Sequence, residues 1–124
     1  MARLLIIDDE PSGAAALAAL LRQKGHDVAC AQTVGTGLTH LRRDRPDLLL
    51  LDLGLPRIDG LELLEALSGE PAFEDLRVAV YSGRDDPEAV ELARRLGACD
   101  YIIKGSDVRE TFDRIETCLS QRPA

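Results

Sequence analysis

Five short apolar runs alternate along the chain with five segments of helical spacing, and this alternation constrains the fold more than any other feature of the sequence. The runs cover residues 4–7, 27–31, 48–51, 78–81 and 101–103. Residues 4–7, 48–51 and 78–81 are apolar at every position, which is typical of strands that are covered on both faces. Residues 27–31 open with a polar side chain, and they suit a strand at the edge of a sheet.

The segments between the runs carry their own signals for where a helix begins or ends. Capping side chains precede three segments, a proline opens two segments and a glycine closes two. These residues are Thr33, Asp59 and Asp86 before the helices, Pro11 and Pro87 in the first turns, and Gly25 and Gly97 at the ends. A last helix is expected from about Ser106, and residues 119–124 are expected to form a flexible tail.

The order of strand and helix, repeated five times without a linker, predicts an α/β fold with parallel strands joined by helical crossovers. Five units are too few for an eight-stranded barrel, so the sequence predicts a three-layer sandwich. The length of 124 residues fits a single domain, residues 1–124. Ligands of such sheets bind beyond the carboxyl ends of the strands, near the point where the strand order reverses.

Polar side chains follow four of the five runs, at the end where a ligand is expected. Asp8 and Asp9 follow the first run, Asp52 the third, Ser82 the fourth and Lys104 the fifth. Carboxylates about 4 Å apart repel each other by about 4 kcal/mol at an effective dielectric constant of about 20. A divalent cation relieves this repulsion, and magnesium suits a site that stays open to a phosphate. The hydroxyl and the ammonium group are donors that hold phosphoryl oxygens.

Each of these residues also has an ordinary structural explanation. Asp8 or Asp9 could cap the helix that begins at Pro11, Ser82 could belong to a turn, and Lys104 could be a solvated charge. The functional interpretation therefore depends on the agreement of four strand ends, because short motifs match by accident.

Composition and charge disfavour several other classes of function. Acidic residues outnumber basic ones by 22 to 15, for a formal charge of -7, which disfavours direct binding to nucleic acid. Cys30, Cys99 and Cys118 lack the spacing of a zinc site or of a disulfide framework. No apolar run is long enough to cross a bilayer and no signal peptide is evident, so we expect a cytoplasmic protein without a membrane partner.

Nearly the whole chain resembles the receiver domain of response regulators in two-component signalling. The matching stretches are residues 4–11 (LLIIDDEP), 46–56 (PDLLLLDLGLP) with Asp59-Gly60 behind them, 81–83 (YSG) and 96–104 (LGACDYIIK). Each stretch is a weak signal alone, but all of them in this order are highly specific. The resemblance implies a flavodoxin-like (βα)5 sandwich with strand order 2-1-3-4-5, in which the first and third strands lie side by side.

The resemblance also implies a role for each polar residue. Asp52 resembles the phosphoacceptor, which takes a phosphoryl group from a histidine kinase, a histidine phosphotransfer protein or a small phosphodonor. Ser82 and Lys104 would each bind a phosphoryl oxygen. The implied magnesium ligands are Asp9 directly, Asp8 mainly through bound water, Asp52, and the backbone carbonyl of Gly54.

The resemblance further implies a conformational switch formed by Ser82 and Tyr101. The serine moves toward the phosphoryl group and the aromatic ring turns inward, which alters the surface made by the fourth helix, the fifth strand and the fifth helix. The implied partners of this surface are a downstream protein, a fused output domain or a second copy of the chain. For a phosphorylation-dependent homodimer, the expected face surrounds Asp100, Tyr101 and Arg114.

Three positions depart from the common pattern of receivers. Gly105 follows Lys104 where most receivers have a proline, often after a cis bond, so the loop that orients Lys104 is expected to be freer or differently shaped. Gly54 and Arg84 occupy positions that, in the receivers this chain resembles, flank the phosphoryl group and tune how quickly water removes it. We hypothesise that Arg84 changes the lifetime of the phosphoryl group by contacting it or by screening the attacking water.

Two other functions stay open. A receiver-like module could bind partners without phosphorylation, which Gly105 favours slightly and the retained acids, serine and lysine oppose. A magnesium-dependent phosphohydrolase usually has a second carboxylate two residues after its nucleophile as a general acid, and Gly54 cannot serve in that role.

Overall fold

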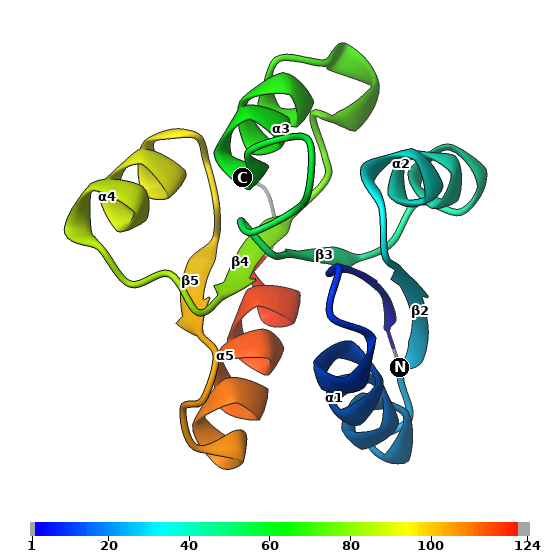
Figure 1. Ribbon diagram of the computed structural model, residues 1–124. Coiled ribbons are helices and arrows are strands. Elements are labelled where there is room, and N and C mark those ends of the chain that lie inside the picture. Colours follow the sequence, from blue (N-terminus) through cyan, green and yellow to red (C-terminus); the bar gives the residue numbers. More distant parts are fainter. Residues whose placement is uncertain (1, 122–124) are drawn as a thin grey trace.

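The computed structural model describes residues 2–121, and its centre is a parallel sheet with the strand order β2-β1-β3-β4-β5 (Figure 1). The strands are β1 (Arg3–Ile7), β2 (Asp27–Ala31), β3 (Leu48–Leu51), β4 (Val78–Ser82) and β5 (Asp100–Ile103). Each strand agrees to within one residue at either end with the run predicted from the sequence. The predicted strand order is therefore confirmed, and β2 lies at an edge as expected.

Helices cover both faces of this sheet (Figure 1). They are α1 (Pro11–Gln23), α2 (Val34–Arg43), α3 (Gly60–Ser68), α4 (Pro87–Arg95) and α5 (Val108–Ser120), with a 3-10 turn η1 (Pro71–Phe73) before β4. One buried apolar cluster joins the sheet to α1 and α5, and a second joins it to α2, α3 and α4. The three layers of the predicted flavodoxin-like sandwich are therefore confirmed. Within residues 2–121, no helix combines the length and the apolar character needed to cross a membrane.

Strand β1 shows why the central runs are apolar without alternation. Leu5 and Ile7 pack into the cluster with α2, α3 and α4, whereas Leu4 and Ile6 pack into the cluster with α1 and α5. Successive side chains of a strand point to opposite faces, so a strand between two helical layers buries both sets. Burial of each such side chain contributes roughly 1.5–3 kcal/mol to folding.

The residues predicted to begin or end helices lie at the helix ends in the structure. The side chains of Thr33, Asp59 and Asp86 each accept a hydrogen bond from a backbone N–H in the first turn of α2, α3 and α4. Such a cap typically contributes about 1 kcal/mol. Gly25 and Gly97 follow α1 and α4 with φ angles of 93° and 95°, a left-handed conformation that favours glycine.

Helix α5 differs from its prediction at both ends. It begins at Val108, two residues after the expected start at about Ser106, and Asp107 caps it, because its side chain accepts a hydrogen bond from the N–H of Arg109 at 2.7 Å. Residues 119 and 120, expected in a flexible tail, belong to the last turn of α5, where Leu119 packs against the apolar cluster shared with α1. Residues 122–124 of that predicted tail lie outside the described residues.

Two glycines allow helices to approach the sheet closely. A Cβ added at Gly60 would lie 2.4 Å from the Cα of Leu53 and 2.8 Å from the carbonyl oxygen of Asp52. A Cβ added at Gly37 would lie 2.5 Å from Cδ1 of Ile7. The first turn of α3 therefore lies directly against the backbone that follows β3.

Candidate functional site

The polar residues that follow four strands meet at one edge of the sheet. β1 and β3 are neighbours in register at their carboxyl ends, so Asp8 and Asp52 follow adjacent strands. The N–H of Asp52 donates to the carbonyl oxygen of Ile7 at 3.0 Å, and the N–H of Lys104 donates to that of Ser82 at 2.9 Å. These hydrogen bonds extend the sheet by one residue and fix the backbone from which the functional side chains project.

Three carboxylates cluster at this edge. One carboxylate oxygen from each of Asp8, Asp9 and Asp52 lies within 4.8 Å of the others. Asp8 is 1% exposed and Asp52 is 7% exposed, whereas Asp9 lies at the surface. A cavity of about 560 Å³ adjoins the cluster, and its lining includes Asp9, Asp52, Gly54, Ser82, Arg84 and Lys104. The structure thus brings together Asp8 and Asp9, which follow β1, and Asp52, which follows β3.

Lys104 is the cation of this cluster. Its Nζ lies 2.7 Å from Oδ2 of Asp8 and 3.2 Å from Oδ2 of Asp52, to which it donates a hydrogen bond. The contact with Asp8 is an ion pair without hydrogen-bond alignment, so within the described residues the buried Oδ2 of Asp8 accepts no hydrogen bond. The ammonium group of Lys104 therefore forms ion pairs with two buried carboxylates, Asp8 and Asp52. The Nζ also lies 5.7 Å from the centroid of the Tyr81 ring, a cation–π contact that the sequence did not indicate.

The surroundings shift the pKa values of the two buried acids, Asp8 and Asp52, in opposite directions. Burial raises the pKa of Asp8 above its ordinary value, despite the nearby ammonium group of Lys104. Burial also opposes ionisation of Asp52, but the hydrogen bond from the N–H of Gly54 and the charge of Lys104 outweigh it and lower the pKa of Asp52. Burial likewise disfavours the charged form of Lys104, and the two carboxylates outweigh that effect and raise its pKa. Asp52 is therefore held as a carboxylate beside a charged lysine.

The acidic cluster fits a divalent cation. Magnesium prefers oxygen ligands and takes one or two carboxylates directly. The N–H of Glu10 donates to Oδ1 of Asp8 at 2.9 Å, which leaves Oδ2 as the buried oxygen without a hydrogen bond. Lys104 supplies one positive charge to that oxygen, but one ammonium group against three carboxylates leaves a net negative charge, which a divalent cation would offset. Asp8, Asp9 and Asp52 are the residues whose side chains could hold the ion.

A path of two hydrogen bonds joins Ser82 to Tyr101 through the backbone of one residue. Ser82 is buried, and its Oγ accepts a hydrogen bond from the N–H of Arg84 at 3.2 Å. The carbonyl oxygen of Arg84 accepts a hydrogen bond from the hydroxyl of Tyr101 at 2.6 Å. Tyr101 is half-buried and packs against the apolar cluster with α2, α3 and α4. Both residues predicted to form the switch therefore contact the loop between β4 and α4.

Two of the three unusual positions have clear local geometry. Gly105 has a φ angle of 88°, and residues 2–121 contain no cis peptide bond, so the chain turns after Lys104 through a left-handed glycine instead of a cis proline. The guanidinium of Arg84 donates from Nε to Oδ1 of Asp86 at 2.7 Å and from Nη2 to Oδ2 at 3.4 Å. This ion pair was not predicted, although opposite charges two residues apart in a loop are a signal for it.

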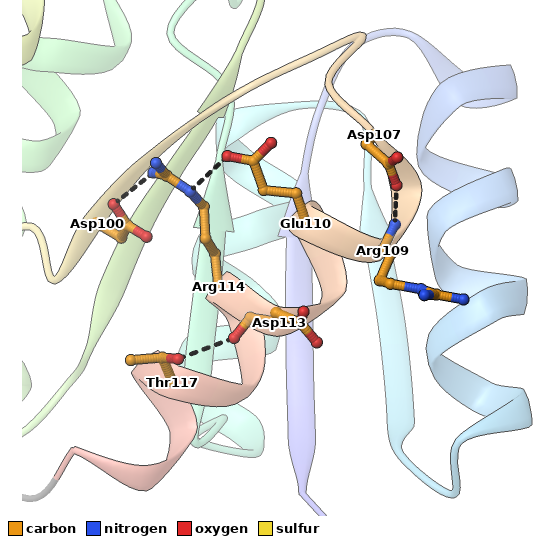
Figure 2. Close-up of a pocket in the computed structure, with 7 residues that line it drawn as sticks. All are labelled: Asp100, Asp107, Arg109, Glu110, Asp113, Arg114 and Thr117. Atoms are coloured by element: carbon orange, nitrogen blue, oxygen red, sulfur yellow. Dashed lines mark hydrogen bonds and ion pairs between the residues drawn. The ribbon is translucent and has the colours of Figure 1, made fainter.

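A charged groove of about 560 Å³ runs along α5 beside β5 (Figure 2). Nη1 of Arg114 donates to Oδ1 of Asp100 at 3.0 Å and to the carbonyl oxygen of Tyr101 at 3.2 Å. Its Nε lies 3.5 Å from Oε1 of Glu110 (Figure 2). The residues predicted for a dimer face, Asp100, Tyr101 and Arg114, therefore form one connected surface.

The fold and the site together define a flavodoxin-like α/β protein whose acidic pocket, with an opposed lysine, lies at the switch point of the sheet. Residues 4–116 match the family described as the response regulator receiver domain. The chain belongs to this family of two-component signalling, as its motifs indicated.

Named relatives support this assignment. The chain is 30% identical to the protein PilH of Pseudomonas aeruginosa over 120 residues, covering 97% of this chain and 99% of PilH. It is 36% identical over 117 residues to the DNA-binding response regulator MtrA of Mycolicibacterium smegmatis, covering 94% of this chain but only 50% of MtrA. The BeF3-activated N-terminal receiver domain of Klebsiella pneumoniae RstA superposes with a TM-score of 0.87 at 27% identity, covering 96% of this chain and 99% of that chain.

Proposed function

We propose that the chain is a phosphoaspartate signalling switch with Asp52 as its phosphoacceptor. The observation that supports this most strongly is the position of Lys104 Nζ, 3.2 Å from Oδ2 of Asp52 among three clustered carboxylates. An ammonium group placed there offsets the charge of an incoming phosphoryl group. In this proposal the chain assists its own phosphorylation and dephosphorylation and is not an enzyme that acts on a separate substrate.

The proposed phosphoryl donor is a phosphohistidine of a histidine kinase or of a histidine phosphotransfer protein. A carboxylate oxygen of Asp52 attacks the phosphorus, the new O–P bond forms, and the N–P bond of the donor breaks. The leaving imidazole keeps the electron pair of the broken bond and takes up a proton. The lowered pKa of Asp52 keeps it ionised for this attack. Ser82 and Lys104 would each donate a hydrogen bond to a phosphoryl oxygen.

The proposed cofactor is Mg²⁺, held by Asp8, Asp9, Asp52 and the backbone carbonyl of Gly54. When bound, the ion supplies positive charge beside the phosphoryl oxygens. The N–H of Glu10 donates to Oδ1 of Asp8 at 2.9 Å, and Oδ2 pairs with Lys104 at 2.7 Å, so the carboxylate is held in one place. Asp9 lies at the exposed rim, where its carboxylate is accessible to an ion that arrives from solvent.

The proposed output begins at Ser82. When its Oγ turns to a phosphoryl oxygen, Ser82 gives up the hydrogen bond from the N–H of Arg84. The carbonyl oxygen of Arg84, which now holds the hydroxyl of Tyr101, moves with the same loop. The ring of Tyr101 is then released to turn inward, and the surface of α4, β5 and α5 around Arg114 changes shape.

The partners of this surface follow from the family. Receiver domains interact with histidine kinases and with downstream output domains. We propose that the changed surface binds a downstream protein, a fused output domain or a second copy of the chain in a phosphorylation-dependent homodimer. The acidic balance of the chain, with a formal charge of -7, favours a protein partner over direct contact with nucleic acid. The proposed location is the cytoplasm.

Incubation with Mg²⁺ and acetyl phosphate, followed by intact mass measurement, tests this proposal. We expect one phosphoryl adduct per chain that is stable in acid and labile in base. Asp52→Asn should form no adduct, because the amide is a poor nucleophile. Asp113→Asn is the matched control, since Asp113 is an exposed acid on α5 remote from the cluster, and it should be phosphorylated like the wild type.

The same experiment separates the two other functions. A folded protein that binds Mg²⁺ and forms no adduct would indicate a receiver-like module that binds partners without phosphorylation. Turnover of many equivalents of acetyl phosphate would indicate a magnesium-dependent phosphohydrolase. Either result would overturn the proposed switch.

A further inference from the structure

Two of the three cysteines form a contact pair at the end of the sheet opposite to the phosphoryl site. Sγ of Cys99 lies 2.8 Å from Sγ of Cys118, across 19 positions of the sequence. Cys99 directly precedes β5, and its N–H donates to the carbonyl oxygen of Val78 at the amino end of β4. Cys118 lies in the last turns of α5 and is 1% exposed. The contact therefore joins the start of β5 to the end of α5.

We propose that Cys99 and Cys118 are an oxidation site that closes to an intramolecular disulfide when the protein meets a peroxide. A disulfide bond is about 2.05 Å long, so the two sulfur atoms need to approach by less than about 1 Å. Cys30, the remaining cysteine, is exposed on β2 at the other edge of the sheet, and it serves as an internal reference.

The two thiols differ in access. Cys99 is partly exposed and lines a groove of about 600 Å³ that α4 and β5 border. Cys118 is buried in the apolar cluster shared with α1. A small oxidant that enters the groove therefore meets Cys99 first, and Cys118 is positioned to react second.

The two thiols also differ in acidity. Their shared hydrogen bond lowers the pKa of Cys99 and raises the pKa of Cys118. The guanidinium of Arg77 donates to the carbonyl oxygens of Cys118 and Leu119 at 2.7 and 2.8 Å, and its charge favours a nearby thiolate. The thiolate is the reactive form of cysteine, so acidity and access both assign the first step to Cys99.

The chemistry balances with a peroxide as the only oxidant. The thiolate of Cys99 attacks one peroxide oxygen, the O–O bond breaks, and the departing hydroxide takes up a proton, which leaves Cys99 as a sulfenic acid. The sulfur of Cys118 then attacks the sulfur of Cys99, the S–O bond breaks, and water leaves with the proton of the Cys118 thiol. The two thiols lose two electrons in total, and the peroxide is reduced to water.

The disulfide would fasten the end of α5 to the strand beside it. α5 carries Arg114 and β5 carries Asp100, so both elements contribute to the charged groove of Figure 2. The link would restrain the end of α5 whatever the state of Asp52. Oxidation is therefore a second input, independent of phosphorylation, to the same pair of elements.

Treatment of the full chain with a small excess of hydrogen peroxide, followed by alkylation under denaturing conditions and peptide mapping, tests the proposal. We expect a protein lighter by two hydrogen atoms, with one alkylated cysteine, Cys30. Peptides that contain Cys99 and Cys118 should stay linked until a reductant is added. The melting temperature should rise by several degrees on oxidation and return on reduction, since the cross-link restricts the unfolded chain.

Cysteine variants test whether the linkage forms between Cys99 and Cys118. Cys30→Ser should form the linkage as the wild type does, whereas Cys99→Ser should not. In Cys118→Ala, Cys99 should instead accumulate as a sulfenic acid that dimedone traps. Mapping of the wild type requires no substitution at the buried position, so a poorly folded Cys118→Ala variant leaves the test intact.

Two results would overturn the proposal. One is oxidation of Cys99 to a sulfinic acid while Cys118 remains a free thiol in the wild type. The other is a linkage that includes Cys30, either within the chain or between two chains. Asp52→Asn should form the Cys99–Cys118 linkage normally, so a failure of the phosphorylation proposal would be distinguishable from a failure of this one.

Discussion

Lys104 and Asp8 form an ion pair of 2.7 Å in which the buried carboxylate oxygen receives charge but no aligned hydrogen bond. The same ammonium group donates a hydrogen bond to Asp52 at 3.2 Å. Asp52 has a second donor in the N–H of Gly54 at 3.2 Å. The protein's own groups therefore satisfy the proposed nucleophile, Asp52, and leave Asp8 with the larger electrostatic penalty of burial.

The Asp8→Asn variant is expected to be more stable than the wild type without magnesium. It removes a buried charge, and Lys104 keeps Asp52 as its partner, so the free energy of unfolding should rise by about 1 kcal/mol. The stabilisation that Mg²⁺ adds to the wild type should shrink or vanish. Urea unfolding with and without Mg²⁺ measures both effects. Asp9→Asn is the control, because Asp9 is exposed and its metal-free stability should change little.

Stability of the metal-free protein is expected to fall as pH rises from about 4, the ordinary pKa of an aspartate, to the raised pKa of Asp8. In this interval the folded protein holds the Asp8 proton more tightly than the unfolded chain does. The contribution of Asp52 to stability depends on pH in the opposite direction, because its pKa is lowered in the folded protein. That contribution is present above about pH 4 and is lost as the pH falls below this value.

Magnesium binding should depend on pH for the same reason. The ion needs an ionised Asp8, so its affinity should fall as pH decreases through the raised pKa of that residue, and binding should release protons. Titration calorimetry in two buffers of different ionisation enthalpy counts these protons. If Asp8→Asn released as many protons on binding Mg²⁺ as the wild type does, Asp8 would not be the source of those protons.

Gly105→Ala is expected to lower both stability and the rate of phosphorylation. An alanine at a φ angle of 88° is strained by roughly 1–2 kcal/mol, and relief of that strain displaces the neighbouring Lys104. Gly97→Ala is the matched control, because its φ angle of 95° is similar and it lies at the opposite end of the sheet. The control should lose comparable stability in urea yet accept phosphate at the rate of the wild type.

Arg84→Ala is expected to speed hydrolysis of the phosphorylated protein by several-fold. A long cationic side chain beside the phosphoryl group either contacts it or screens the attacking water, and alanine does neither. Arg84 pairs with Asp86 in the structure, so this role requires the guanidinium to leave that carboxylate. Decay of the adduct over time measures the rate, and Arg109→Ala on α5 controls for the loss of a positive charge. Equal decay in wild type and Arg84→Ala would end the hypothesis.

Tyr101→Phe is expected to loosen the loop between β4 and α4 without preventing phosphorylation. The substitution removes only the hydrogen bond from the hydroxyl to the carbonyl oxygen of Arg84, so stability should fall by about 1 kcal/mol or less. Hydrogen exchange of residues 83–86 should accelerate in the unphosphorylated protein. Tyr81→Phe is the control, because the hydroxyl of Tyr81 is not part of this path. Exchange that is identical in Tyr101→Phe and wild type would argue against the path.

The sequence was most informative where one physical rule determines the structure. Apolar runs without alternation can be satisfied only between two helical layers, so the strands were predicted to within a residue at either end. Parallel strands place their carboxyl ends at one edge of the sheet, so the sequence predicts that Asp8, Asp52, Ser82 and Lys104 meet there, as the structure shows.

The sequence was less informative where several side chains could serve equally well. Ser106 and Asp107 are both good capping residues, and only the hydrogen bond to the N–H of Arg109 decides between them. The contact between Cys99 and Cys118 depends on how α5 lies against β5, which residue spacing alone does not determine. The features that the sequence did not predict, such as the cap of α5 and the contact between the two cysteines, therefore depend mainly on side-chain packing and less on secondary structure.

The close contact at Gly60 limits where movement can occur if Asp52 is phosphorylated as proposed. There is no room for even a methyl group between Gly60 of α3 and the backbone of Asp52 and Leu53. We therefore expect α3 to keep its position relative to Asp52. The loop on the other side contains Arg84, whose backbone is attached to Ser82 and Tyr101 by single hydrogen bonds that can exchange partners. In the proposed switch, displacement should therefore pass from Asp52 toward α4, while α3 stays in place.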